Sequence, residues 1–200
     1  MWSIGAPAKS DAQGNFTIRN LASSQYYFAA RSQIRSWYLK SFAISPAATG
    51  TAQPRKPIDV TRVWTTVKTG ERLSGLIVTF GEGAASLQGQ VTLSEGETLP
   101  KQLAVYLVPA EREAADELLR FYVGPVSKEG KIDLHNLAPG RYWILMQEVT
   151  DVTAAPLTKM RLPDETETRA RLRREAEAAK TEIELKPCQN VTDYRLPLKP

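Results

Sequence analysis

The sequence predicts a mainly β protein made of two tandem antiparallel β-sandwiches. Three observations support this fold class. A motif near the N-terminus returns without a gap in the second half, and a second motif is also duplicated at nearly the same distance from the first. Short segments with alternating apolar and polar residues recur at intervals of about 8 to 12 residues, with turn residues between them. A length of 200 residues is sufficient for two such sandwiches.

The first motif covers residues 11–26 and returns at residues 127–142. In each copy a turn glycine, Gly14 or Gly130, precedes alternating apolar and polar residues that lead to an Asn-Leu pair. A turn glycine followed by period-2 alternation is typical of a hairpin and a strand with one buried face. The motif therefore predicts one supersecondary unit used twice.

The second motif covers residues 67–80 and 185–198, which match in the placement of their apolar residues. Cys188 stands where the first copy has Gly70, in a turn between two expected strands, and it is the only cysteine of the chain. No internal disulfide is therefore expected. A reactive thiol needs a neighbouring cation or base, and the sole histidine, His135, belongs to another motif. We interpret Cys188 as a small turn residue.

The first sandwich is predicted over residues 1–85, because the glycine-rich segment 81–85 separates two strand patterns. Its copy of the first motif has only ten residues ahead of it, whereas the second copy has about 40, so we expect an N-terminally truncated sandwich without its opening strands. Such a sheet would expose an unpaired edge. The expected elements are a strand pair over 14–30, strands over 37–44, 58–68 and 73–80, and a loop over 49–57.

The second sandwich is predicted over residues 86–200 and contains one inserted helix at about 163–180. Pro163 suits the first helical turn, acidic residues follow where the helix dipole favours them, and opposite charges stand four residues apart. A short helix or helical loop is expected over 110–120. The expected strands are 86–93, 103–108, 121–126, 131–134, 141–148, 181–186 and 191–198, with loops at 94–101 and 150–162.

Composition limits the classes of partner. Hydrophobic residues make up 42% of the chain and charged residues 24%, which is ordinary for a folded globular protein. The net charge of +4 is small, and much of the Lys and Arg alternates with Glu, so nucleic acid is not expected as a partner. No apolar run reaches the roughly 18 residues that a membrane-spanning helix needs.

The duplicated motif resembles the repeat of carboxypeptidase regulatory-like domains of bacterial proteins. The resemblance covers most of the chain and implies prealbumin-like (transthyretin-like) or Ig-like sandwiches, which are also grouped with carbohydrate-binding-like folds. In the first copy, Ser23-Ser24 departs from the Pro139-Gly140 of the second. The residues that carry the resemblance are Asp11-x-x-Gly14-x-Phe16-x-Ile18-x-Asn20-Leu21, Gly89-x-Val91 and Gly130-x-Ile132-x-Leu134-x-Asn136-Leu137-Ala138-Pro139-Gly140-x-Tyr142.

The function implied by the resemblance is a non-catalytic structural or protein-interaction module of a larger exported bacterial protein. Such a protein would be periplasmic, outer-membrane-associated or extracellular, with an export signal upstream. The expected partners are other domains of the same parent protein or cell-surface proteins, and the parent could be an enzyme or an outer-membrane receptor. The zinc peptidase chemistry of the family's name belongs to a separate domain, and one histidine cannot build a His-rich zinc site.

Carbohydrate binding is the alternative function, because flat aromatic rings stack on sugars. The candidate contacts for a polysaccharide or a partner are Trp37, Tyr38 and Trp143. Side chains of adjacent strand residues point to opposite faces, so one of Tyr142 and Trp143 is expected in the core.

No catalytic, cofactor-binding or metal-binding residue is predicted. The acidic pairs Glu95 with Glu97 and Asp164 with Glu165 stand in loop or helix-start positions, where no burial would separate their pKa values. Asp11, Asn15 and Asp133 lack the spacing of a calcium loop and are interpreted as turn caps.

Overall fold

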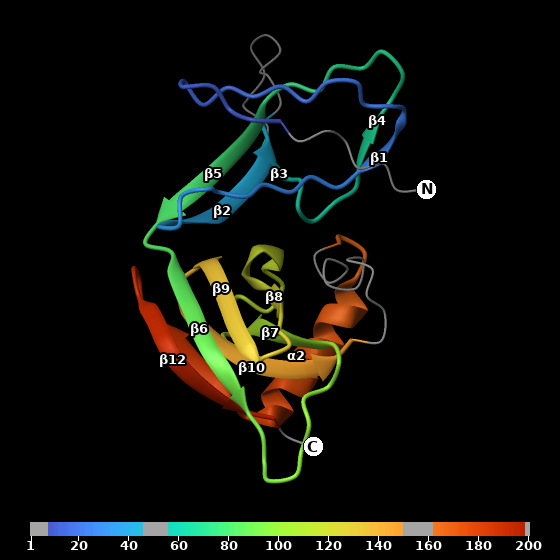
Figure 1. The fold of residues 1–200 in the computed structure, drawn as a ribbon. Coiled ribbons are helices and arrows are strands. Elements are labelled where there is room, and N and C mark those ends of the chain that lie inside the picture. Colours follow the sequence, from blue (N-terminus) through green and yellow to red (C-terminus); the bar gives the residue numbers. More distant parts are fainter. Residues whose placement is uncertain (1–7, 46–55, 150–161, 199–200) are drawn as a thin grey trace.

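The computed structural model describes residues 8–45, 56–149 and 162–198. Within these ranges the protein is mainly β, with several antiparallel sheets and one α-helix, as the sequence predicts. Figure 1 shows the strands of the N-terminal half in the upper part of the molecule and those of the C-terminal half, with the helix, in the lower part. Most of each predicted loop, 49–57 and 150–162, lies outside the described residues.

The N-terminal part forms two small sheets around its own apolar cluster. The sheet orders are β3-β2-β5 and β1-β4, and all of these pairs are antiparallel. The strands are β1 Ser24–Tyr26, β2 Trp37–Ile44, β3 Ile58–Asp59, β4 Thr65–Val67 and β5 Leu76–Glu82. The buried residues of the cluster are Tyr26, Phe28, Phe42, Val60 and Val67.

The C-terminal part forms two larger sheets, with the orders β11-β10-β7-β8 and β12-β6-β9. β12 pairs with β6 in parallel, so the expectation of a purely antiparallel arrangement is wrong for this pair. The strands are β6 Ala85–Thr92, β7 Leu103–Pro109, β8 Tyr122–Pro125, β9 Lys131–Leu137, β10 Gly140–Glu148, β11 Glu182–Leu185 and β12 Asn190–Pro197; the helices are the 3₁₀ turn η1 Leu118–Arg120 and α2 Thr166–Ala179.

Strand β7 is buried along its whole length because both of its faces are covered. Val105 and Leu107 belong to the apolar cluster that fills the space between the two sheets. Tyr106 and Val108 point to the opposite face, where Leu172 of α2 covers them. A strand with two covered faces reads as a continuous apolar run rather than as an alternation.

Helix α2 begins later than predicted. The expected pairing of opposite charges four residues apart is present for Arg171 with Glu175 (3.8 Å), but two other arginines bond to backbone. Arg173 stands four residues before Glu177, a spacing that predicts an ion pair, but it donates instead to the carbonyl oxygens of Pro109 (2.6 Å) and Ala110 (3.0 Å), where β7 ends. Arg169 is buried and donates to the Leu162 carbonyl oxygen (2.6 Å). The Arg173 bonds fasten the helix to the end of β7, whereas the Arg169 bond holds the segment that leads into the helix.

Three strand predictions for the N-terminal part need correction. The predicted pair over 14–30 contributes only β1, and residues 14–23 belong to no sheet in the described part of the chain. The predicted strand over 58–68 is divided into β3 and β4, because Asp59 Oδ1 accepts from the Thr61 amide (2.9 Å) and turns the chain. The strand predicted from residue 73 begins at Leu76, since Gly75 is left-handed (φ 75°).

Both copies of the first motif close the same turn. Asp11 Oδ1 accepts from the Asn15 amide (2.8 Å), and Ser127 Oγ accepts from the Lys131 amide at the matching place (3.1 Å). Turn capping is therefore confirmed for Asp11. Asp133 lies elsewhere than predicted, because it accepts from Gln88 Nε2 across the strands (3.1 Å).

Both copies also build the same corner. The corner asparagines Asn20 and Asn136 are left-handed (φ 60° and 57°). Six residues later in each copy a buried tyrosine donates from its hydroxyl to the carbonyl oxygen four residues before it, at 2.7 Å for both Tyr26 and Tyr142. A hydroxyl that bonds back to the upstream backbone in this way is the tyrosine corner of β-sandwiches.

The second motif is also duplicated in three dimensions. Lys68 and Lys186 each donate their amide to the side-chain oxygen of the residue three positions on, at 2.7 Å in both copies. Cys188 has φ 60° and Gly70 has φ 75°, so both occupy a left-handed turn position. The turn assignment of Cys188 is confirmed.

Candidate functional site

The candidate site is a groove in the N-terminal part with a volume of about 1030 Å³. One wall is the segment 16–21, and the other is the segment 70–76 that leads into β5. Phe28 and Val67 reach it from the core of this part. A groove of this volume lies at the upper limit of ordinary ligand sites, which suits an extended ligand better than an ion.

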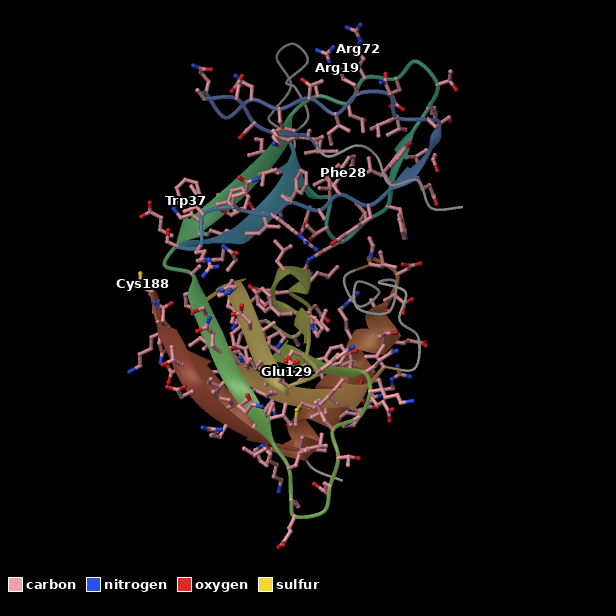
Figure 2. The ribbon with its side chains drawn as sticks, in the orientation of Figure 1. Arg19, Phe28, Trp37, Arg72, Glu129 and Cys188 are labelled. Atoms are coloured by element: carbon pink, nitrogen blue, oxygen red, sulfur yellow. The ribbon has the colours of Figure 1, made fainter. Side chains whose placement is uncertain are left out.

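The groove is lined by apolar and polar residues, and its charged lining residues are three cations and the carboxylate of Glu71, which accepts from the Lys68 amide (2.7 Å). Phe16, Ile18 and Leu73 line it and pack on the N-terminal core while staying partly exposed. Arg19 and Arg72 line the same groove, one from each wall, and both are exposed. Figure 2 shows both arginines projecting outward at the top of the molecule. These residues are not among the site residues predicted from the sequence. The duplication could have pointed to them, because the matching residues of the second copy lie on the two strands that flank β6.

A cluster of Glu111, Arg120 and Tyr142 supports the C-terminal core. Arg120 donates to Glu111 Oε2 (3.0 Å) and from Nε to the Tyr142 hydroxyl (3.2 Å), and its guanidinium lies 4.9 Å from the centre of the Tyr142 ring. Glu111 Oε1 also accepts from the Arg141 amide (2.9 Å). Burial raises the pKa of Tyr142. Each of these polar groups is occupied by its neighbours, so we interpret the cluster as a structural support.

Glu111 predicts an acid-sensitive contribution to stability. Partial burial opposes ionisation, but hydrogen bonds from the Arg141 amide and Arg120 outweigh it and lower the pKa of Glu111 below its usual value of 4.5. A lowered folded-state pKa means that this stabilisation is present above about pH 4.5 and is lost as the pH falls through the folded-state value. Urea denaturation at pH 7 and pH 3 should therefore show a smaller pH dependence in Glu111→Gln than in wild type. An unchanged pH dependence would contradict this role.

The three aromatic residues chosen as candidate contacts do not form one platform in the structure. Trp37 stacks on Phe80, with ring centres 6.3 Å apart, and Tyr38 packs on the core of the C-terminal part. Trp143 packs on the cluster beneath α2, while Tyr142 beside it is fully buried, as the strand geometry predicts for one of the two. The three candidate side chains, Trp37, Tyr38 and Trp143, are each half-buried, and each packs against a different group of residues. Their use as carbohydrate or partner contacts stays a prediction.

Two of the acidic residues considered from the sequence, Glu97 and Asp133, have local partners. Glu97 caps its own loop by accepting from the Ser94 amide (3.0 Å). An oxygen of Asp133, Oδ1, lies 2.7 Å from His135 Nε2. Partial burial raises the pKa of Asp133, but hydrogen bonds from Gln88 and His135 outweigh burial, so the pKa is lowered. Among the described residues, no group of three or more His, Cys, Asp or Glu side chains is arranged to hold a metal ion.

Comparisons with protein-family models, with curated proteins and with solved structures find no match to this chain. The resemblance to carboxypeptidase regulatory-like domains therefore stays a prediction made from the motifs. No helix in the described ranges combines the length and the apolar composition that crossing a membrane requires.

Proposed function

We propose that the chain is a non-catalytic structural and protein-interaction module, in which two tandem β-sandwich units are held in a fixed relative orientation. The duplicated turns and corners support two related units. The single observation that carries the proposal is the junction between the N-terminal and C-terminal parts, because that junction is hydrogen-bonded through several segments.

The connection itself is tied down on both sides. The Ala84 amide donates to the Ser36 carbonyl oxygen (2.9 Å), which joins the start of β6 to the segment before β2. The Cys188 amide donates to the Gly83 carbonyl oxygen (3.0 Å), which joins the same connection to the turn before β12. In Figure 2, Cys188 lies on the left of the molecule, beside the connection between the two parts. A two-residue connection with bonds to both parts restricts hinge motion.

Asn136 forms a second bridge across the junction. Its Nδ2 donates to the carbonyl oxygens of Ile34 (2.8 Å) and Trp37 (2.6 Å), which stand just before and at the start of β2. Tyr38 adds an apolar contact by packing on the C-terminal core. Hydrogen bonds and packing at separate points around one connection support a stiff spacer that sets the direction of whatever it joins.

The larger setting of the module is part of the proposal. The motif resemblance supports a place in an exported bacterial protein, with other domains of the parent protein or cell-surface proteins as partners. Fractionation of cells that produce the full-length parent protein tests this setting, with recovery in the periplasmic, outer-membrane or culture-medium fraction expected. Recovery in the cytoplasmic fraction alone would contradict it.

The junction is tested by Asn136→Gly, which removes the bridging amide and keeps a residue that tolerates a left-handed φ. Asn20→Gly is the matched control, because Asn20 holds the equivalent corner position in the first copy. NMR relaxation and residual dipolar couplings should fit one rigid body for wild type and for the control, and two partly independent bodies for Asn136→Gly. Independent tumbling of the two parts in wild type would overturn the proposal.

A further inference from the structure

The place that β6 fills in the C-terminal part corresponds to the groove in the N-terminal part. β6 lies between β12 and β9, parallel to the first and antiparallel to the second. By the alignment of the motifs, the residues of β9 match segment 15–21, and the residues of β12 match the segment that starts at Arg72. Those two segments are the walls of the groove.

The edge of β5 that faces the groove has no strand paired to it within residues 8–45, 56–149 and 162–198. The Ser45 amide donates to the Gly75 carbonyl oxygen (2.8 Å), and Ile77 is paired with Ala43. The backbone N–H and C=O groups of Gly75 and Ile77 therefore point toward β2. Leu76 and Val78 therefore direct their backbone groups to the opposite edge. Their counterparts in β12 face β6, since Leu198, two residues beyond Leu196, donates to the Thr92 carbonyl oxygen (2.9 Å).

The other wall offers a similar edge. In the C-terminal part, Val91 of β6 donates to the Gly130 carbonyl oxygen (2.9 Å), and the ladder continues along β9. Gly14 stands at the matching place in the first copy and has the same left-handed conformation. The segment 16–21 that follows belongs to no sheet in the described part of the chain. Two backbone edges that have no sheet partner in the described chain, on either side of a groove with apolar residues in its walls, form the arrangement that accepts an added strand.

From this geometry we propose that the groove binds an extended segment of a partner protein as an inserted β-strand, parallel to β5 and antiparallel to residues 14–18. The inference rests on the proposed role as an interaction module and names the kind of partner. The described part of the chain holds no spare strand for this place, because β6 is already paired on both edges. The place is assigned to another polypeptide on the charge of its lining residues: the arginines favour an acidic strand, and the stretches 1–7 and 46–55 that adjoin this part in the sequence contain no acidic residue.

The side chains expected in the inserted strand can be inferred from the residues of β6 and from the charged residues Arg19 and Arg72 that line the groove. Leu87 and Val91 of β6 point into the core and Gly89 lies between them, so the inserted strand should carry apolar residues at alternate inward positions. Ser86 of β6 donates to Asn190 (2.8 Å), and the first copy has Arg72 at the position of Asn190. With Arg19 on the facing wall, an acidic residue is favoured at the position of Ser86.

The test uses three eight-residue peptides based on residues 85–92. One carries glutamate at the position of Ser86, the second carries lysine there, and the third is the glutamate peptide with an N-methyl group on its central glycine. The glutamate peptide should bind the full chain about tenfold more tightly than the lysine peptide at low salt, from two exposed charge contacts. The N-methyl peptide should bind at least roughly tenfold more weakly, because a backbone donor is lost. NMR shifts should map to residues 14–18 and 72–78.

The paired variant Arg19→Glu with Arg72→Glu supplies the matched protein control. Both side chains are exposed, so the fold should be kept while the preference between the glutamate and lysine peptides is reversed. Lack of binding at millimolar peptide, equal binding of the N-methyl peptide, or shifts outside the groove would overturn the inference. A dimer of the chain alone that the peptide dissociates would assign the groove to a second copy and overturn the assignment to a partner. If binding fails while Asn136→Gly still loosens the junction, only the groove proposal falls.

Discussion

Replacing Tyr142 with alanine is expected to lower the free energy of unfolding of the C-terminal part by about 3–5 kcal/mol, the usual effect of removing a fully buried aromatic ring. Tyr142 has no exposed surface and packs edge-on against Tyr122, with ring centres 5.9 Å apart. Its removal also takes the donor from the Ala138 carbonyl oxygen and the acceptor from Arg120 Nε. Urea denaturation followed by tryptophan fluorescence measures the loss.

Two companion variants separate the contributions to this loss. Tyr142→Phe keeps the ring and removes the hydroxyl, so about 1–2 kcal/mol should be lost through unmet hydrogen bonds in the core. Tyr26→Ala removes the equivalent corner tyrosine of the first copy, and hydrogen exchange should then show lost protection in the N-terminal part and retained protection in β7 and β10. A loss of less than roughly 1 kcal/mol for Tyr142→Ala would contradict the corner's structural role.

The second large effect is expected from Gly75→Ala in the N-terminal part. Gly75 has φ 75°, and a Cβ placed there would lie 2.2 Å from the backbone oxygen of Ser45 in the chain that continues β2. The left-handed conformation alone costs an alanine about 1–2 kcal/mol. The contact with Ser45 is with backbone and can only be relieved by moving β2. The total loss of unfolding free energy should therefore exceed that figure.

Gly14→Ala is the control for the conformational cost alone. Gly14 also has a positive φ (84°), but a Cβ there would meet no atom within 4 Å. This variant should cost roughly 1 kcal/mol, and the difference between the two variants measures the close approach of β2. Equal losses for Gly14→Ala and Gly75→Ala would show that β2 does not press on this turn. In the C-terminal part the matching residue is Asp193, which has φ 57°. A side chain fits there because β12 is the edge strand of its sheet in the described chain, with no strand in the place that β2 has beside β5.

The strands in the N-terminal part show where sequence reasoning reaches its limit. The alternation of residues 14–21 predicts a strand, yet this segment lies in no sheet of the described chain. Periodicity reports which side chains prefer burial, whereas strand formation also needs a neighbouring backbone. The groove could not be predicted for the same reason: its walls meet only when segments about fifty residues apart come together.

The sequence by itself determined the β class, the duplication, the capped turns with their glycines, the corner that ends at Tyr26 and Tyr142, and the helix that starts near Pro163. These are local features, set by side chains within a few residues of the backbone that they bend or cap. Only the tertiary structure decided the parallel pairing of β12 with β6, the two-sided burial of β7, the Asn136 bridge and the edge of β5 that is unpaired in the described chain. Each of these depends on which distant backbone lies alongside, and the energy of that choice comes from packing spread over many residues.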